Sequence, residues 1–206
     1  MMDAGRSFSG NERNCFFINL GNGKFADISG LSGLDFPDDG RAISVTDWDN
    51  DGDLDLWITN RNAPRLRLMR NDTKEVNSFI SLRLSGNGKT VNKDAIGARI
   101  EIINGNDSGK FKQIKTLRAG QGFLSQSSKW IPFALNETIK SINIKISWPD
   151  GTVSKIEDVL PNKKYIIRQE KSTAEEVKLE SEKSNLVSSP GLKTPPSQVA
   201  RIPAIT

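Results

Sequence analysis

The sequence lacks histidine and has a single cysteine, Cys15, among its 206 residues. Without histidine there is no His-ligated zinc site, no Ser-His-Asp triad and no Cys-His dyad. A lone cysteine cannot form an internal disulfide bond, so disulfides do not hold this fold together. Because Cys15 lies in the apolar run CFFINL, we expect its thiol to be buried and inert.

Long apolar runs are also absent. No stretch approaches the roughly 18 apolar residues of a membrane-spanning helix, so we expect no membrane insertion. The opening residues MMDAGRSFSGNERN are polar and lack the apolar segment of a secretory signal. They fit either a cytoplasmic protein or a fragment whose native N-terminus lies upstream. The net charge of +4 is spread along the chain, which argues against nucleic acid as a partner.

Short β-prone runs separated by Gly, Asn and Asp predict an all-β fold. Segments such as SLRLS and INIKIS alternate polar and apolar residues, as strands with one wet face do. The expected strands are Cys15–Leu20, Ala42–Asp47, Leu54–Thr59, Arg65–Arg70, Phe79–Leu84, Ala98–Ile103, Phe111–Leu117, Lys129–Ala134, Ile142–Trp148, Thr152–Ile156 and Lys164–Arg168.

The composition changes twice along the chain, which predicts three segments. Residues 1–72 are rich in Asp and Asn, whereas residues 73–170 have longer, lysine-rich strands. Residues 171–206 begin with the charged run STAEEVKLESEKS, for which we expect a short solvated helix. They continue into a Pro- and Ser-rich stretch that is typical of a linker or disordered tail.

The stretch DWDNDGDLD, residues 47–55, predicts a calcium site. Ca²⁺ takes six to eight oxygen ligands, and a loop offering side chains at positions 1, 3, 5 and 9 with a carbonyl at position 7 can surround it. The expected ligands are Asp47, Asp49, Asp51 and Asp55, together with Asp53 through its carbonyl. Gly52 allows the sharp turn that folds the loop back on the ion.

The loop begins like an EF-hand but does not end like one. An EF-hand has a bidentate Glu at position 12 and two flanking helices, whereas here position 12 is Ile58 and both flanks are β-prone. We therefore expect a loop between two hairpin strands. The alternatives are a solvated acidic turn with no ion, magnesium, which prefers fewer protein ligands, and catalysis by paired carboxylates.

The N-terminal residues NCFFINLGNGKFADISGLSGL and GRAISVTDWDNDGDLDLWITN resemble the FG-GAP/VCBS repeat, a β-propeller blade unit. In that family the aspartate loop binds calcium, and the resemblance implies that all five carboxylates, Asp47, Asp49, Asp51, Asp53 and Asp55, are ligand positions. A closed propeller needs about four to eight blades, whereas this chain resembles about one. We expect upstream repeats and a signal peptide in the native protein, rather than a blade that packs only on the second domain.

Residues beyond the blade resemble the ASPIC/UnbV domain. The shared motifs are Asn92–Arg99 (NKDAIGAR), Gly120–Gln126 (GQGFLSQ) and Trp148–Gly151 (WPDG), which occur in the family's order. The pairing of this domain with the blade resembles bacterial relatives of cartilage acidic protein. That resemblance implies an extracellular or surface role without known catalysis.

Several motif residues admit both structural and functional interpretations. We expect Gly97 to serve a bulge or a close backbone approach, with Arg99 paired to Asp94, although a polar recognition site is the alternative. Trp148 is expected in the core. The loop residues Gly120, Gly122, Ser125 and Gln126 fit a turn or a ligand-contacting loop, and Trp48 fits a shield over the calcium loop or an exposed anchor for a partner.

The sequence thus predicts an all-β chain made of a partial β-propeller blade with a calcium hairpin loop and a β-sandwich-like or barrel-like ASPIC/UnbV domain. We expect a non-catalytic, calcium-binding adhesion or interaction module of a secreted, periplasmic or cell-surface bacterial protein. Its partner would be a protein or a carbohydrate. The alternatives are an accessory domain of a larger secreted enzyme or redox protein, and a calcium-dependent carbohydrate-binding module.

Overall fold

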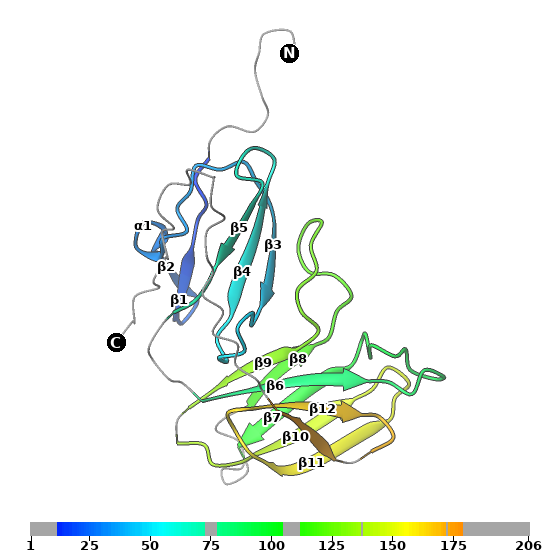
Figure 1. Cartoon of the computed structure of the whole chain (residues 1–206). Coiled ribbons are helices and arrows are strands. Elements are labelled where there is room, and N and C mark those ends of the chain that lie inside the picture. Colours follow the sequence, from blue (N-terminus) through cyan, green and yellow to red (C-terminus); the bar gives the residue numbers. More distant parts are fainter. Residues whose placement is uncertain (1–11, 73–77, 105–111, 137, 172, 179–206) are drawn as a thin grey trace.

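The computed structural model describes residues 12–72, 78–104, 112–136, 138–171 and 173–178. Strands dominate this part of the chain, and its helix, α1 (Ser29–Ser32), is a single turn. Figure 1 shows two units, one above the other, with strands β1 to β5 in the upper unit and β6 to β13 in the lower. The all-β prediction is confirmed.

The first unit contains two small antiparallel sheets. Its strands are β1 (Phe17–Gly21), β2 (Lys24–Asp27), β3 (Gly40–Thr46), β4 (Asp55–Asn60) and β5 (Leu66–Met69). β1 pairs with β2 around the turn at Asn22, and β3, β4 and β5 form a separate sheet in that order. The predicted hairpin around the aspartate loop is therefore present, with Thr46 opposite Asp55 at its closed end.

Apolar burial in this first unit is small. Among the described residues its core consists of Leu34, Ile58 and Met69, with a few partly buried neighbours. Large apolar side chains of the β1–β2 hairpin are exposed, including Phe17 at 55% and Phe25 at 62%. A sheet with so little apolar burial is marginal in water, so this unit needs stabilisation from other contacts.

Cys15 is exposed, which makes the prediction of a buried thiol wrong. The predicted strand, Cys15–Leu20, starts two residues too early, because β1 begins at Phe17. The side chain that packs toward the small core at this point is Phe16. The CFFINL run is thus at the surface of a thinly covered hairpin rather than inside a core.

The second unit is a sandwich of two four-stranded sheets. Its strands are β6 (Ser78–Ser85), β7 (Arg99–Asn104), β8 (Lys112–Thr116), β9 (Ile131–Leu135), β10 (Ile142–Ser147), β11 (Val153–Val159), β12 (Lys163–Arg168) and β13 (Ala174–Val177). One sheet has the order β11-β10-β7-β8 and the other β13-β12-β6-β9. The pairing of β6 with β12 is parallel, and the other pairings are antiparallel.

The sandwich holds the main hydrophobic core. Alternate residues of β10, namely Ile142, Ile144 and Ile146, are buried, as the polar-apolar pattern of INIKIS predicts. The predicted core position of Trp148 is confirmed, since it is 3% exposed and its indole Nε1 donates to Ser154 Oγ at 2.9 Å. This unit buries many more apolar side chains than the first and can support its own fold.

The prediction of a helix in STAEEVKLESEKS is wrong for its described part. Residues 174–177 form β13, which pairs with the strand β12 and adds an edge to the sandwich. Ion pairs join the two strands, with Lys163 Nζ 2.6 Å from Glu176 Oε2. The remainder of that run and the predicted Pro- and Ser-rich tail lie outside the described residues. The first residue of the predicted strand Phe111–Leu117 and residues 73–77 at the predicted domain boundary also lie outside them.

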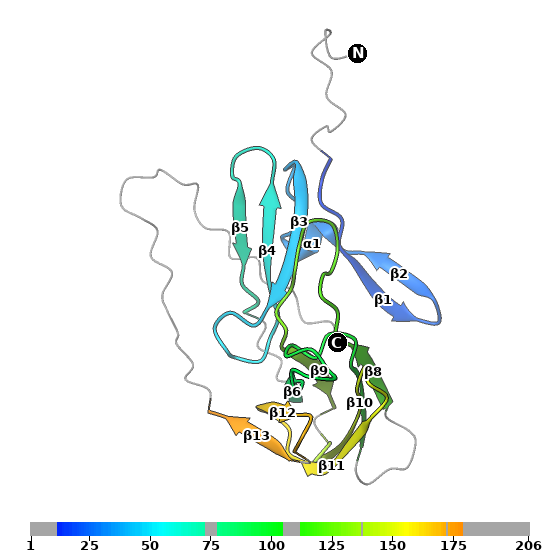
Figure 2. The same cartoon turned by 90° about the vertical axis from the view of Figure 1, so that its right-hand side faces the viewer.

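A loop from the sandwich joins the two units. The segment between β8 and β9 rises beside β3, as both Figure 1 and Figure 2 show. Ser128 N donates to Val45 O at 3.0 Å, and Val45 N donates to Ser127 Oγ at 3.1 Å. This loop therefore satisfies backbone groups on the otherwise open edge of β3.

Candidate metal centre

The aspartate loop connects β3 to β4 and turns back sharply at Gly52. Gly52 has φ +100°, a conformation that residues with a Cβ rarely adopt. A Cβ at this position would also overlap the ring of Phe79 on β6. Glycine is required here for two reasons, the backbone conformation and the close approach of the sandwich.

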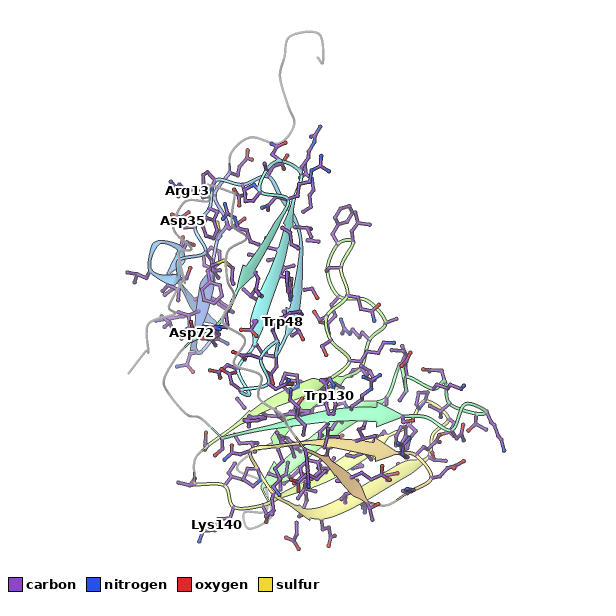
Figure 3. The ribbon with its side chains drawn as sticks, in the orientation of Figure 1. Arg13, Asp35, Trp48, Asp72, Trp130 and Lys140 are labelled. Atoms are coloured by element: carbon purple, nitrogen blue, oxygen red, sulfur yellow. The ribbon has the colours of Figure 1, made fainter. Side chains whose placement is uncertain are left out.

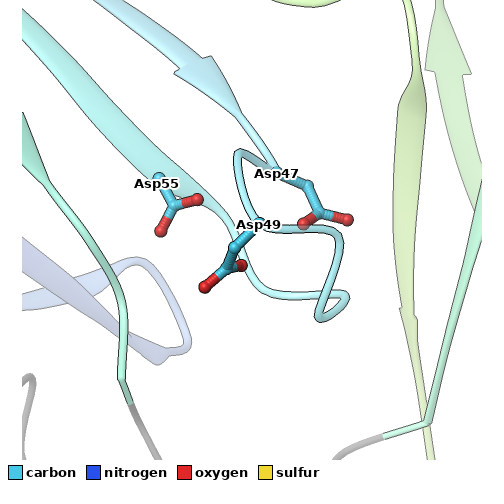
Figure 4. Close-up of side chains that lie close together, drawn as sticks. All are labelled: Asp47, Asp49 and Asp55. Atoms are coloured by element: carbon cyan, nitrogen blue, oxygen red, sulfur yellow. The ribbon is translucent and has the colours of Figure 1, made fainter. Parts of the chain in front are cut away.

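Three of the five predicted ligands converge within the loop. One carboxylate oxygen from each of Asp47, Asp49 and Asp55 lies within 4.8 Å of the other two. Figure 4 shows these side chains, from the start of the loop and the start of β4, around one space. The spacing of the motif thus places positions 1, 3 and 9 together, as the sequence predicts.

Two oxygens of this cluster are buried without a hydrogen-bond partner among the described residues. They are Oδ1 of Asp47 and Oδ1 of Asp49. A buried carboxylate oxygen without a donor is costly, because the desolvation of the charge is not offset. These two atoms mark the place where a cation would be most stabilising.

Asp55 has a structural task as well as a place in the cluster. Its side chain is buried, and its two oxygens accept hydrogen bonds from Trp48 N at 2.7 Å and Asn71 N at 2.8 Å. These bonds fix the loop to the segment that follows β5. A carboxylate oxygen has more than one lone pair, so Asp55 retains capacity to bind an ion.

Asp51 and Asp53 lie outside the three-carboxylate cluster. Asp51 Oδ1 accepts a hydrogen bond from Asp53 N at 2.9 Å, which shapes the turn. Burial raises the pKa of Asp53 to about 6, and repulsion from the neighbouring aspartates adds to this rise. The pKa of Asp51 is also raised, mainly by burial. Both groups would be relieved by a nearby positive charge, and both stay predicted ligands.

The donor set fits calcium. It consists of carboxylate oxygens of three aspartates that lie within 4.8 Å of one another, and two oxygens of these aspartates have no hydrogen-bond partner among the described residues. Calcium accepts such all-oxygen sets in flexible geometry, whereas magnesium demands near-octahedral geometry and keeps several waters. Asp47, Asp49 and Asp55 are the residues that would hold the ion.

Lys164 reaches the loop from the sandwich, a contact that the sequence did not predict. Its Nζ lies 2.8 Å from Asp47 Oδ2 and donates to Asn50 Oδ1 at 2.7 Å. Lys164 is 3% exposed, and its Nζ lies 5.8 Å from the centroid of the Trp130 ring. From the sequence alone, strand alternation places Lys164 on the solvent-facing side, because Tyr165 and Ile167 occupy the side that faces the core. No local signal reveals that the outer face of β12 is covered.

A second cation, Arg70, lies near the cluster. Arg70 Nε lies 2.8 Å from Asp72 Oδ1 and 4.0 Å from Asp49 Oδ2. Between them, Lys164 and Arg70 partly balance Asp47 and Asp49 but leave both Oδ1 atoms without a partner. The loop therefore carries more negative charge than its own protein neighbours neutralise.

Trp48 lies between two cluster aspartates and is 49% exposed. Its ring packs edge-on against Trp57, with ring centroids 5.1 Å apart. Figure 3 labels Trp48 and Trp130 on the two sides of the junction between the units. Trp48 thus both packs on the hairpin and exposes part of its ring. The exposure and the packing fit a shield over the calcium loop and an anchor for a partner equally.

The other motif residues have mostly structural roles. Gly97 has φ +96°, so the backbone conformation favours glycine at this position. A Cβ here would meet the Pro149 side chain at an ordinary contact distance, so a close approach is not what requires glycine. The predicted pairing of Arg99 with Asp94 is wrong. Lys129 Nζ takes Asp94 Oδ2 at 2.5 Å, and Arg99 Nε lies 3.6 Å from Glu101 Oε1 on the same strand. The strand direction turns Arg99 away from the preceding turn.

The loop containing Gly120 and Gly122 forms a turn, and the residues that follow it contact β3. Gly122 has φ +73°, and Ser125 Oγ donates to Gln121 O within the turn. Beyond the turn, Gln126 O accepts a hydrogen bond from Ser44 Oγ at 2.8 Å. The motif thus positions the segment that closes the edge of β3.

Residues 88–174 match the family described as ASPIC and UnbV. The match covers β7 to β12 and the first residue of β13, which is most of the sandwich. It begins after β6 and does not include the aspartate loop. A comparison with curated proteins found no match. Among the described residues no helix is long and apolar enough to cross a membrane.

Proposed function

We propose that the chain is a non-catalytic, calcium-binding interaction module of a secreted or cell-surface protein. In this proposal the first unit is an FG-GAP/VCBS-like blade whose loop holds the ion, and the ASPIC/UnbV sandwich supports the loop from below. The observation that carries the proposal is the pair of buried, unpartnered oxygens, Oδ1 of Asp47 and Oδ1 of Asp49.

The ion's task in this proposal is structural. Calcium supplies two positive charges that neutralise the converging carboxylates. Asp47, Asp49 and Asp55 hold the two ends of the loop together, and Gly52 seats the loop against Phe79. An ion that binds only the folded state stabilises that state by RT ln(1 + [L]/Kd). This contribution matters here because the first unit has only a small core of its own.

Two features support a non-catalytic role. The chain has no histidine to act as a general base near neutral pH, and its cysteine is remote from the loop in sequence and exposed. The raised pKa of Asp53 follows from burial and from crowding by other aspartates. An ion bound in the loop would oppose that crowding, so the raised pKa is what a calcium loop requires as much as what a proton donor requires.

An extracellular location fits the expected affinity. Extracellular calcium modules bind with Kd values of about 10⁻⁴–10⁻³ M, whereas cytosolic buffers bind far more tightly. Here Asp55 already accepts two backbone hydrogen bonds and Asp47 already pairs with Lys164, so neither offers all its oxygens. A loop of this kind suits millimolar calcium.

The test is terbium luminescence with Trp48 as the donor, followed by displacement with calcium. We expect sensitised emission in the native chain and its loss in Asp49→Asn. Asp158→Asn is the matched control, because Asp158 is exposed, lies on β11 and has φ +55°, which asparagine tolerates. Equal emission from all three proteins would contradict the proposed site.

A further inference from the structure

A cleft of about 740 Å³ opens between the two units, beside the aspartate loop. Val45, Thr46 and Leu54 line it from the first unit, and Trp130 and the segment 114–118 line it from the sandwich. Its volume lies within the range of about 300–1,000 Å³ that ligand sites commonly occupy. The cleft therefore has the size of a binding site for several linked small units.

Positive charge dominates the lining of this cleft. Arg99, Lys115 and Arg118 line it, and Asp47 is the acidic residue among its lining residues. Asp47 is already paired with Lys164. Two of the cations are also engaged, since Arg99 Nε lies 3.6 Å from Glu101 Oε1 and Lys115 Nζ donates to the carbonyl of Pro132. Arg118 is exposed and has no ion-pair partner among the residues that the structure describes. The unbalanced charge favours an anionic ligand.

The neutral part of the lining combines amides with apolar surface. Gln121 and Gln126 are exposed and offer both donors and acceptors. Leu54 is 38% exposed and Ile114 is 40% exposed, and the ring of Trp130 lies nearby in the same lining. A ligand that matches this lining has hydroxyl groups for the amides, an apolar ring face for the hydrophobic side chains and a negative charge for the cations. An acidic sugar has all three.

An extended peptide fits this cleft less well. Peptides that bind sheet edges gain their affinity from main-chain hydrogen bonds. Three edge strands, β3, β8 and β9, contribute residues to the lining, and two of them, β3 and β9, are already engaged. The backbone of β3 bonds to Ser127 and Ser128 through Val45. On β9 the carbonyls of Pro132 and Ala134 accept side-chain hydrogen bonds from Lys115 and Gln113.

We propose that this cleft binds an acidic oligosaccharide, whose carboxylate or sulfate groups pair with Arg118. Arg99 and Lys115 add positive charge to the same lining, and a sugar ring lies on its apolar part. The inference rests on the proposed function, because it names the partner class of an interaction module. It places the ligand next to the calcium loop and requires no ligand oxygen on the ion.

The experiment is isothermal titration calorimetry of the full chain in about 0.15 M salt, which screens nonspecific surface attraction. The probes are a hyaluronan hexasaccharide, which carries carboxylates, and a heparin hexasaccharide, which also carries sulfates. A neutral chitin hexamer and hexaglutamate serve as comparison ligands. Each titration is run in calcium and in chelator, alongside the thermal response to calcium.

We expect one or both acidic saccharides to bind, and the Arg118→Gln variant to bind at least about tenfold more weakly. Arg65→Gln is the matched control, because Arg65 is exposed in the turn between β4 and β5, at the far end of those strands from the aspartate loop. Gln121→Ala is a second cleft variant, for which we expect a loss of about threefold or more. Both positions are exposed, so folding should persist.

Three results would overturn the inference: no binding of either acidic saccharide, equal or tighter binding of the neutral hexamer or hexaglutamate, or equal losses in Arg118→Gln and Arg65→Gln. The proposed function is judged separately by the calcium response. If calcium stabilises the chain but neither acidic saccharide binds, the proposed calcium module stands and the proposed saccharide site in the cleft is wrong. If an acidic saccharide binds but calcium does not change the melting temperature, the saccharide site stands and the proposed calcium role is wrong.

Discussion

The ion pair between Lys164 and Asp47 predicts that calcium and the sandwich stabilise the same loop. In Lys164→Met the buried carboxylate of Asp47 loses its counter-charge. The two side chains are 4% and 11% exposed, so solvent cannot replace the lost partner well. Removing one partner of a buried pair costs about 3–5 kcal/mol, because the other charge stays buried.

We expect this cost to depend on calcium. In chelator the variant should lose about 3 kcal/mol of stability, which lowers Tm by about 6–12 °C at about 2–4 °C per kcal/mol. In millimolar calcium the ion takes over as the counter-charge of Asp47, and the loss should fall to less than about half. The calcium-induced rise in Tm should therefore be larger in the variant than in the native chain.

Lys163→Met is the matched control, since Lys163 is the neighbouring residue and pairs with Glu176 at the surface. An exposed pair contributes about 0–1 kcal/mol, so Tm should change little in either condition. Differential scanning fluorimetry of the three proteins measures the effect. If Lys164→Met loses the same stability with and without calcium, the ion does not reach Asp47 and the reasoning is refuted.

Three further predictions concern the turn, the charge of the loop and the core. Gly52→Ala should lower the free energy of unfolding by about 2–4 kcal/mol, because strain at φ +100° is added to an overlap with Phe79. The control Gly151→Ala, at φ +84° in open space, should lower it by about 1–2 kcal/mol, and chemical denaturation measures both. The folded-state pKa of Asp53 is raised from 3.8 to about 6, so the folded chain binds this proton more tightly than the unfolded chain. In chelator, stability should rise as pH falls from about 7 to about 5, and this rise should shrink in Asp53→Asn and in calcium; a flat profile would count against the crowded loop. Ile144→Ala in the sandwich core should cost about 2–5 kcal/mol, while Ile43→Ala, at a half-exposed position, should cost well under that in urea unfolding; similar losses would contradict the core assignment.

Local sequence accounts for the strands and for the shape of the loop. INIKIS reads as a strand because alternate isoleucines need one buried face, and β10 shows that pattern. The alternation failed at CFFINL, where the apolar run belongs to an exposed hairpin with little to pack against. It also missed β13, whose glutamates pair with Lys163 and Arg168 of the adjacent strand β12 instead of marking a helix.

The convergence of Asp47, Asp49 and Asp55 was predictable, because nine consecutive residues with Gly52 at their centre have few ways to turn between two paired strands. The contacts that surround this cluster were not. Lys164 and Phe79 reach the loop from strands far along the chain, and their approach depends on the parallel register of β6 and β12. The cleft depends further on how the segment 126–128 docks on β3. Sequence neighbours alone determined the acidic loop, whereas its counter-charge, its burial and the adjoining cleft were decided by tertiary packing, because side-chain contacts across such separations depend on register and sheet placement that no local pattern encodes.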